Sequence, residues 1–206
     1  MAVTTVIFDM GGVLVWTHWE RATVPLGRLA GTTSEKVMGT IRTGDAYLPF
    51  MRGEIDTAEF AGRMAASLRM RMPVEEFIAL WNSILAPNPG AGRILERLKG
   101  KIRLALGSNT DPEHYKRSVE VQPALALFDD VLLSYELGVC KPDAAFFSLA
   151  LEGLGVGAEE CVFIDDLSEN VASAMALGIE GILFKSMAQV EQELTRMGIL
   201  PGKTGV

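Results

Sequence analysis

Short runs of apolar, often β-branched residues recur along the chain, with longer amphipathic stretches between them. Such runs cover residues 3–8, 102–106, 130–133, 161–164 and 179–183. Apolar runs of this length are typical of buried strands, and helical patterns between them predict right-handed crossovers that keep the strands parallel. The pattern therefore predicts an α/β fold in which helices cover a parallel sheet.

Local signals also predict where some of the crossover helices begin and end. Amphipathic spacing predicts helices over residues 111–121 and 168–177. Asp111 is the expected N-cap of the first of these, and Pro112 suits its first turn because that position needs no backbone donor. Gly178 is expected to end the second helix.

The long segment between the first two apolar runs carries helical periodicity and no convincing strand. Helices are expected over its amphipathic stretches, at residues 19–30, 34–42, 57–69 and 74–85. Capping boxes that begin at Thr32 and Asp56 mark two of the starts. The stretch 86–90, rich in proline and glycine, is expected to be a hinge that returns to the sheet. Inserted after the first strand, this helical cap would lie over the ends of the strands and act as a lid.

These elements divide the chain into two domains. The core domain is expected to comprise residues 1–15 and 88–200, the α-helical cap domain residues 16–87, and residues 201–206 a flexible tail. Hydrophobic residues make up 49% of the chain and charged residues 22%, which is typical of a globular protein rather than a disordered one.

The charge balance and the cysteine count exclude several classes of protein. The net charge is −7, with 19 basic against 26 acidic residues, which argues against a nucleic-acid partner bound through a broad basic face. Cys140 and Cys161 form neither a disulfide framework nor a zinc motif, and both are expected to be buried thiols. No apolar run approaches the roughly 20 residues that span a bilayer. We expect a cytoplasmic protein with no membrane partner, as a monomer or a homodimer.

Asp9 is the first residue with candidate chemistry. It follows a buried strand and precedes Gly11 and Gly12, where the backbone can bend and approach a ligand closely. Ligands of open α/β sheets bind at the carboxyl ends of the strands, which is where Asp9 would lie. The residue is a candidate nucleophile; the alternative is an ordinary aspartate in a turn.

Two later turns carry groups suited to an anion. Ser108 and Asn109 end the second core strand and precede a helix N-terminus, a combination that can bind a phosphate. A polar turn without function is the alternative. Lys141, fixed by Pro142, supplies a compact positive charge if it points inward, and is a solvated loop residue if it does not.

Asp165 and Asp166 are adjacent carboxylates at the end of the fourth strand. Such a pair repels itself unless a cation or hydrogen bonds compensate, so a hard divalent ion is expected, and Mg²⁺ fits best. One of the two aspartates should point toward Asp9. The other would support the site from behind, together with neighbouring donors.

In order and spacing, these segments resemble the motifs of the haloacid dehalogenase (HAD) superfamily. The resemblance covers the whole core and implies a doubly wound, Rossmann-like parallel sheet, with the helical cap inserted after the first motif. It also implies a small phosphorylated metabolite as substrate. The segments 53–56, 106–110 and 164–170 look especially like those of bacterial phosphatases that act on glucose 1-phosphate.

The resemblance also implies a role for each motif residue. Asp9 would attack phosphorus to form an aspartyl-phosphate, which water then hydrolyses. Lys141 would offset the negative charge between Asp9 and the phosphoryl group. The remaining roles would be phosphate binding by Ser108, Asn109, Lys141 and Gly12, ligation of Mg²⁺ by Asp9, the carbonyl of Gly11 and Asp166, and support of that shell by Asp165 and Asn170.

The chain departs from the superfamily pattern at Gly11, where most phosphatases carry a second aspartate that moves protons. General acid–base catalysis is typically worth about 10² to 10⁴ in rate. Either the leaving group is a good one, as in an anomeric sugar phosphate or an acyl phosphate, or the cap supplies the proton. His18 and Glu20 are the cap candidates, and a solvated helix face is their alternative role.

Aromatic side chains are the candidate lining of a substrate pocket in the cap. Trp16, Trp19 and Trp81 suit the faces of sugar rings, although Trp81 also suits helix packing. Arg21 would either reach the substrate or lie at the surface.

Two other functions remain open from the sequence. One is a 2-haloacid dehalogenase, which uses the same nucleophile without a metal and is disfavoured by the acidic pair. The other is a binding or regulatory protein that has kept the fold but is catalytically impaired at Gly11.

Overall fold

The computed structural model describes residues 2–201. Its main sheet has the order β5-β4-β1-β6-β7, with every neighbouring pair parallel. The strands are β1 (Thr5–Phe8), β4 (Arg103–Ser108), β5 (Asp130–Leu133), β6 (Cys161–Asp165) and β7 (Glu180–Leu183). The predicted α/β fold class, a doubly wound parallel sheet, is confirmed. Because β1 is central, the ends of β4 and β6 lie on either side of the end of β1.

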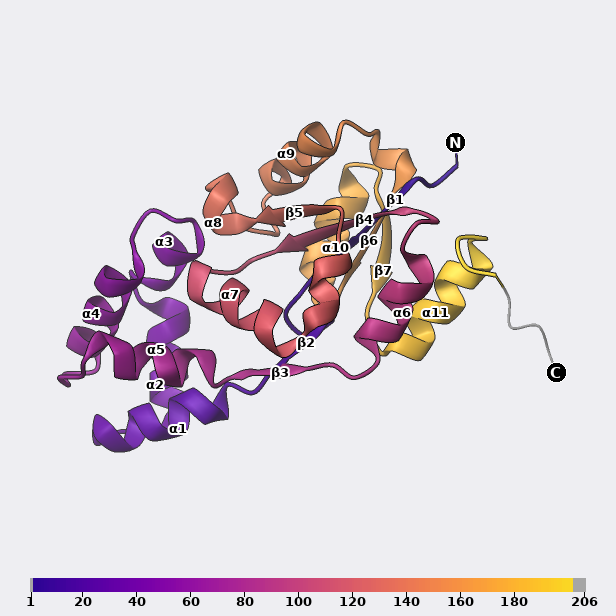
Figure 1. Ribbon diagram of the computed structural model, residues 1–206. Helices are drawn as coiled ribbons and strands as arrows, with labels where there is room; N and C mark the ends of the chain where they lie inside the picture. Colours follow the sequence, from indigo (N-terminus) through magenta and orange to yellow (C-terminus); the bar gives the residue numbers. More distant parts are fainter. Residues whose placement is uncertain (1, 202–206) are drawn as a thin grey trace.

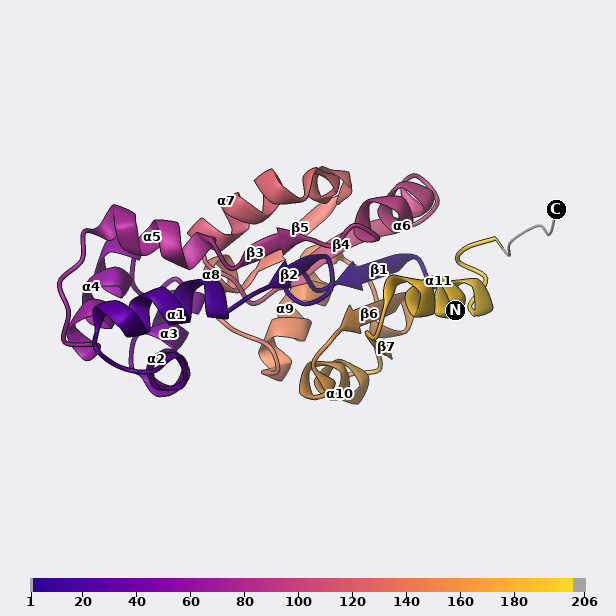
Figure 2. The same ribbon diagram turned by 90° about the horizontal axis from the view of Figure 1, so that it is seen from below.

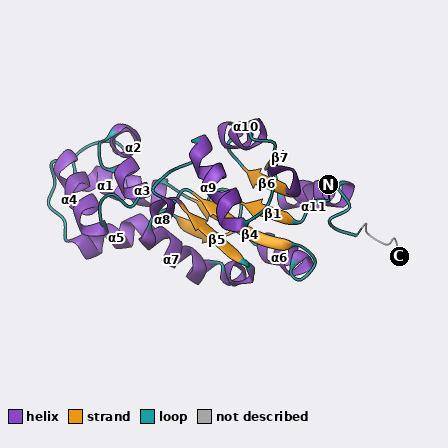
Figure 3. Ribbon diagram, turned by 90° about the horizontal axis from the view of Figure 1, so that it is seen from above, coloured by secondary structure: helices purple, strands orange, loops and turns teal. Residues whose placement is uncertain are grey.

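Helices cover both faces of the sheet, as the alternation of strand side chains requires. Val6 and Phe8 pack on one face and Ile7 on the other. The helices are α6 (Ala91–Leu98), α7 (Pro112–Val121) and α11 (Met187–Arg196) on the first face, and α9 (Ala144–Leu154) and α10 (Ser168–Ala176) on the second. Figure 3 shows α6 and α7 on one side of the strands and α9 and α10 on the other.

The inserted helices form a separate group at one end of the molecule (Figures 1 and 2). They are α1 (Glu20–Leu29), α2 (Ser34–Thr43), α3 (Tyr47–Met51), α4 (Thr57–Ser67) and α5 (Val74–Asn82). A two-stranded antiparallel ribbon of β2 (Val15–Thr17) and β3 (Leu85–Pro87) joins this cap to the core. The remaining short elements are α8 (Ser134–Leu137) and the 3-10 helices Pro123–Leu127 and Ala158–Glu160.

The structure differs from the sequence expectations in a few local details. The inserted segment was expected to lack strands, yet β2 and β3 lie at its two ends; strands of this length are too short to show a period. Helix α3, which contains Pro49, was not expected. The N-cap of α2 is Thr33, whose side chain accepts from the Lys36 amide, rather than Thr32. The Asp56 cap of α4 is confirmed.

Asp111 is confirmed as the N-cap of α7, and its carboxylate also joins the cap to the core. Asp111 Oδ1 accepts from two amides of its own helix, and Oδ2 accepts from Trp81 Nε1 of α5 at 3.0 Å. His114, one turn along α7, stacks on the Trp81 ring at 4.6 Å and donates from Nε2 to the Trp81 carbonyl oxygen at 2.9 Å. Trp81 is therefore a buried residue that packs between the cap and the core, and it is not part of a pocket.

A second contact joins the cap to the core near α3 and α8. Ser134 Oγ donates to the Met51 carbonyl oxygen at 2.6 Å. Gly53 adopts a left-handed conformation with φ of 68°, and a Cβ there would lie 2.2 Å from the Tyr135 carbonyl oxygen. Only glycine allows so close an approach. The cap thus contacts the core at two points besides the ribbon.

Further expectations concern the cysteines and the ends of the chain. Both cysteines, Cys140 and Cys161, are buried and free, as expected. Apart from Pro201, the predicted tail lies outside the described residues. Within residues 2–201, no helix combines the length and apolar character needed to cross a bilayer.

Candidate active site

Asp9 is the first residue after the central strand. Its backbone amide donates to the Ile164 carbonyl oxygen at 2.8 Å, which continues the pairing of β1 with β6 by one residue. The residue is buried, with 7% of its surface exposed. The carboxylate is thus held rigidly at the carboxyl edge of the sheet, between the ends of β4 and β6.

Lys141 points inward, to the end of β1. Its Nζ donates to Asp9 Oδ1 at 2.6 Å, to Asp165 Oδ2 at 2.7 Å and to the Gly107 carbonyl oxygen at 2.8 Å. An ammonium group has three donors, so each of them is used here. The structure therefore brings Lys141 to Asp9 and does not leave it as a solvated loop residue.

Asn109 fixes the backbone of Lys141. Its Nδ2 donates to the Lys141 carbonyl oxygen at 2.7 Å, and its Oδ1 accepts from the Lys141 amide at 2.8 Å. Two hydrogen bonds between one side chain and one residue fix both distance and orientation. Asn109 also lines the cavity, so its expected contact with phosphate stays a prediction.

The acidic pair divides into a buried member and an exposed one. Asp165 accepts from Lys141, from Asn170 Nδ2 at 3.0 Å and from the Leu167 amide at 2.8 Å. Asp166 is exposed and lines the cavity beside Asp9. The hydrogen bonds leave Asp165 in a supporting position and Asp166 available to a ligand.

Gly12 is required for the approach of Asp166. Its φ is 83°, and a Cβ at this position would lie 2.3 Å from Asp166 Oδ2. Any other residue would therefore push the carboxylate away and strain the backbone. Gly12 was expected to bind phosphate. In the structure it lies against Asp166 and is not among the described residues that line the cavity.

The carboxylates fit a hard divalent cation. One oxygen from each of Asp9, Asp165 and Asp166 lies within 4.8 Å of the others. All-oxygen donor sets suit Mg²⁺. Burial, and then the neighbouring Asp165 charge, raises the pKa of Asp166. A cation between these groups would remove their mutual repulsion.

Asp9 and Lys141 respond to the same buried charges in different ways. Burial raises the pKa of Asp9 to about 7; Lys141 opposes this shift, and Asp165 and Asp166 add to it. For Lys141, burial lowers the pKa, but the charges of Asp9 and Asp165 outweigh burial and raise it. The lysine therefore stays charged, and burial favours the protonated form of Asp9 when no metal is bound.

The raised pKa of Asp9 predicts a pH-dependent stability of the metal-free protein. In the folded protein Asp9 keeps its proton up to about pH 7, whereas the unfolded chain loses it near pH 3.8. The metal-free wild type therefore loses stability as the pH rises between these two values. In EDTA, the stability of Asp9→Asn relative to wild type should therefore increase between about pH 5 and pH 8, by on the order of 2 kcal/mol. Urea unfolding of both proteins at the two pH values measures this difference. A difference that does not change with pH contradicts the prediction.

A cavity of about 370 Å³ opens between the strand ends and the cap. Its lining includes Asp9, Gly11, Asn109, Lys141, Asp166 and Asn170 from the core, and Thr17, Trp19, Met38, Ile41, Arg42 and Tyr47 from β2 and the cap. Ser108 is the last residue of β4 and precedes Asn109, which lines the cavity. Its hydroxyl is buried and has no hydrogen-bond partner among the described residues. Such an unpaired donor is what a bound oxyanion would satisfy.

Several residues expected to contact the substrate do not line this cavity. In β2, Thr17 faces the cavity, so the adjacent Trp16 points to the other side, where it packs 6.3 Å from the Phe184 ring. His18 is partly buried and Glu20 is exposed, with His18 Nδ1 3.5 Å from Glu20 Oε1. Arg21 contacts the Ser83 carbonyl oxygen at the surface. Of these expected cap contacts, Trp19 alone reaches the cavity.

The sequence analysis missed the cap residues that do line the cavity. Met38, Ile41 and Arg42 lie along one side of α2, and Tyr47 begins α3. Amphipathic spacing identifies the buried face of a helix but not which of its flanks borders a cavity. No signal in the sequence separates these residues from their neighbours.

The chain belongs to the haloacid dehalogenase-like hydrolases, whose family model matches residues 3–178. The protein is thus a hydrolase. Among solved structures it is similar to a HAD family enzyme from Bacteroides thetaiotaomicron in complex with magnesium and inorganic phosphate. The TM-score is 0.80 and the identity 25%, and the match covers 89% of this chain and 95% of the other.

Curated relatives of similar length are phosphatases. A sesquiterpene phosphatase from Aspergillus oryzae is 29% identical over 181 residues, which cover 85% of this chain and 87% of the relative. D-ribitol-5-phosphate phosphatase from Bacteroides thetaiotaomicron is 25% identical over 202 residues, which cover 94% and 97%. Two further relatives are much longer, and the chain spans 38% and 20% of their lengths.

Proposed function

We propose that this protein is a Mg²⁺-dependent phosphomonoesterase that hydrolyses a small phosphorylated metabolite through an aspartyl-phosphate. The observation that carries the proposal is the buried Asp9 carboxylate, hydrogen-bonded to Lys141 and beside the exposed Asp166, at the base of a cavity of about 370 Å³. The phosphatases among the relatives support the reaction class.

In this proposal an oxygen of Asp9 attacks phosphorus, and the bond from phosphorus to the ester oxygen breaks. The alcohol leaves with the electron pair of that bond and takes a proton from solvent or substrate. Water then attacks the aspartyl-phosphate, releasing inorganic phosphate and regenerating the carboxylate. Lys141 orients Asp9 throughout, and the unpaired Ser108 hydroxyl donates to a phosphoryl oxygen.

Charge repulsion explains why a cation is needed. A phosphate charge 4 Å from ionised Asp9 is repelled by about 4 kcal/mol at an effective dielectric of 20. Lys141 offsets part of this, but it is already shared between Asp9 and Asp165. Asp9, Asp166 and the carbonyl of Gly11 would hold Mg²⁺, with Asp165 and Asn170 behind them. When bound, Mg²⁺ neutralises the phosphoryl oxygens and polarises phosphorus.

The names of the relatives leave the leaving group open. Ribitol and a sesquiterpene alcohol differ in almost every property except the hydroxyl that carries the phosphate. The cap would select between such alcohols, because its side chains form the outer part of the cavity. Selectivity should therefore follow the cap residues of this chain rather than its overall similarity to either relative.

A phosphatase screen with and without metal tests the proposal. The purified chain is stripped with EDTA and assayed for phosphate release from p-nitrophenyl phosphate and a panel of phosphorylated metabolites. We expect the stripped protein to lose at least about 10²-fold in rate and to recover with Mg²⁺. Full phosphate release in EDTA would overturn the metal requirement, and chloride release from a 2-haloacid would instead indicate a dehalogenase. No turnover of any ester would indicate a binding protein.

A further inference from the structure

Arg42 is a positive charge in the cavity that the proposed chemistry does not use. Lys141 and Arg42 are the cations among the described residues that line the cavity, and the donors of Lys141 are fully engaged. Arg42, in the last turn of α2, forms no hydrogen bond or ion pair with any residue between 2 and 201. A guanidinium has five donors in a planar fork that matches a carboxylate or a phosphate.

The rest of the outer cavity is mainly apolar. Trp19, Met38, Ile41 and Leu167 supply hydrocarbon surface. Thr17 and Tyr47 are the described lining residues outside the acidic centre that carry a hydroxyl group. A polyol would find few protein partners for its hydroxyls here, and hydroxyls that lose water without gaining a partner disfavour binding. The lining suits a leaving group with an apolar body.

A second groove adjoins the cavity at its apolar side. This groove shares Trp19, Met38 and Arg42 with the cavity and continues outward between α1 and α2. Glu20 and Glu35 line its outer part. An anion is attracted at Arg42 and repelled by the glutamates beyond it. Among the described residues that line the cavity and the groove, Arg42 is therefore the one that favours a negative group other than the transferred phosphate.

From these contacts we infer that the substrate is a phosphomonoester with a compact apolar body and a second anionic group, a carboxylate or another phosphate, which Arg42 binds at the mouth of the cavity. This inference rests on the proposed phosphatase function. It assigns Arg42 to substrate selection and not to the transfer of the phosphoryl group.

Matched substrates test the inference. Para-(phosphonooxymethyl)benzoate and its methyl ester share the same scissile bond and the same apolar ring, and differ in one negative charge. We expect wild type to prefer the carboxylate by at least about 10-fold in kcat/KM, since hydrogen bonds to charged groups contribute about 1.5–3 kcal/mol. A third probe, with a phosphonate in place of the carboxylate, separates the two kinds of anion.

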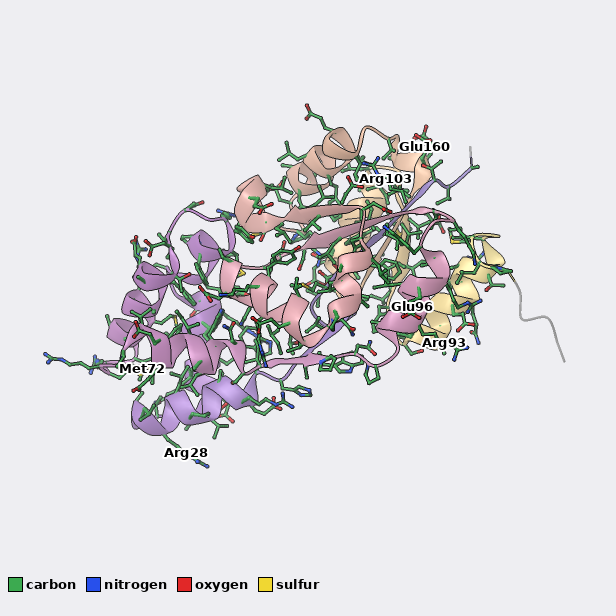
Figure 4. The ribbon with its side chains drawn as sticks, viewed as in Figure 1. Arg28, Met72, Arg93, Glu96, Arg103 and Glu160 are labelled. Atoms are coloured by element: carbon green, nitrogen blue, oxygen red, sulfur yellow. The ribbon has the colours of Figure 1, made fainter. Side chains whose placement is uncertain are left out.

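Variants of Arg42 link that preference to the residue. In Arg42→Met, the ratio of kcat/KM for the carboxylate to that for the ester should fall by about 10- to 100-fold, because each 1.4 kcal/mol is tenfold. Arg42→Lys should retain part of the preference because it keeps the charge but loses the fork. Arg28→Met is the matched control: Arg28 lies on α1, points away from the molecule and should leave the ratio unchanged (Figure 4).

The outcomes separate this inference from the proposed function. A wild-type enzyme that hydrolyses the methyl ester as well as the carboxylate overturns the second anion while leaving the phosphatase function intact. Equal losses on both probes in Arg42→Met would place the guanidinium on the transferred phosphoryl group and also overturn the inference. If wild type hydrolyses neither probe nor p-nitrophenyl phosphate, the phosphatase proposal itself is wrong.

Discussion

Asp9→Asn should abolish phosphate release while leaving the protein folded. Asparagine keeps the shape of the side chain but is not a nucleophile, and removal of a nucleophile typically costs roughly 10⁴-fold or more in rate. The carboxylate is hydrogen-bonded to Lys141 at the base of the cavity, and Asp9 is the buried carboxylate among the described lining residues, whereas Asp166 is exposed. Steady-state release of phosphate with saturating Mg²⁺ measures the loss.

Trapping the aspartyl-phosphate tests by chemical means whether Asp9 is the nucleophile. Wild type, quenched in acid during turnover, should carry one phosphoryl group on the peptide that contains Asp9, as detected by mass spectrometry, and Asp9→Asn should carry none. Asp45→Asn is the matched control, since Asp45 is an exposed cap aspartate outside the cavity lining. Substantial turnover by Asp9→Asn, or a phosphoryl group found on another residue, contradicts the assignment of the nucleophile.

Gly11→Asp should raise kcat on phosphate esters that have poor leaving groups. Gly11 lines the cavity, and a Cβ added there would meet only the Thr17 methyl group, at an ordinary 3.7 Å. Its backbone lies outside the left-handed region that would strain another residue. A carboxyl at this position would protonate the leaving oxygen and then activate water, a contribution of about 10² to 10⁴.

The dependence on leaving group distinguishes acid catalysis from an indirect effect. The gain of Gly11→Asp should be largest for alkyl phosphates and small for p-nitrophenyl phosphate, whose leaving group needs no proton. Gly11→Asn, with the same shape and no transferable proton, is the control. Equal effects of the two substitutions, or an equal gain on every ester, would show that position 11 does not act through proton transfer.

Local sequence signals were sufficient for the core of this molecule. Strand residues 130–133 and the Asp111 cap were predicted as observed. Asp9 and the acidic pair could be identified because strand order and the rule on carboxyl ends bring them to one edge of the sheet. Each of these predictions depends on a short segment and on a general rule of sheet architecture.

The cap could not be predicted in the same way, because its functional side chains depend on how helices dock. Arg42 and Tyr47 border the cavity only because α2 and α3 are oriented over the end of β1. Trp16 was assigned to the pocket, but strand alternation in β2 turns it toward Phe184. The ribbon of β2 and β3 was missed because each strand is short and its partner lies far away in the sequence.

The central position of β1 has a consequence for how this enzyme matures on the ribosome. Asp9 is synthesised before both strands that flank it, and Lys141 follows it by 132 residues. Until then the nascent strand exposes two unpaired edges, which are prone to pairing with other chains. Contacts between such distant residues also form slowly. The proposed nucleophile therefore acquires its surroundings only after Lys141 and strand β6 have been synthesised.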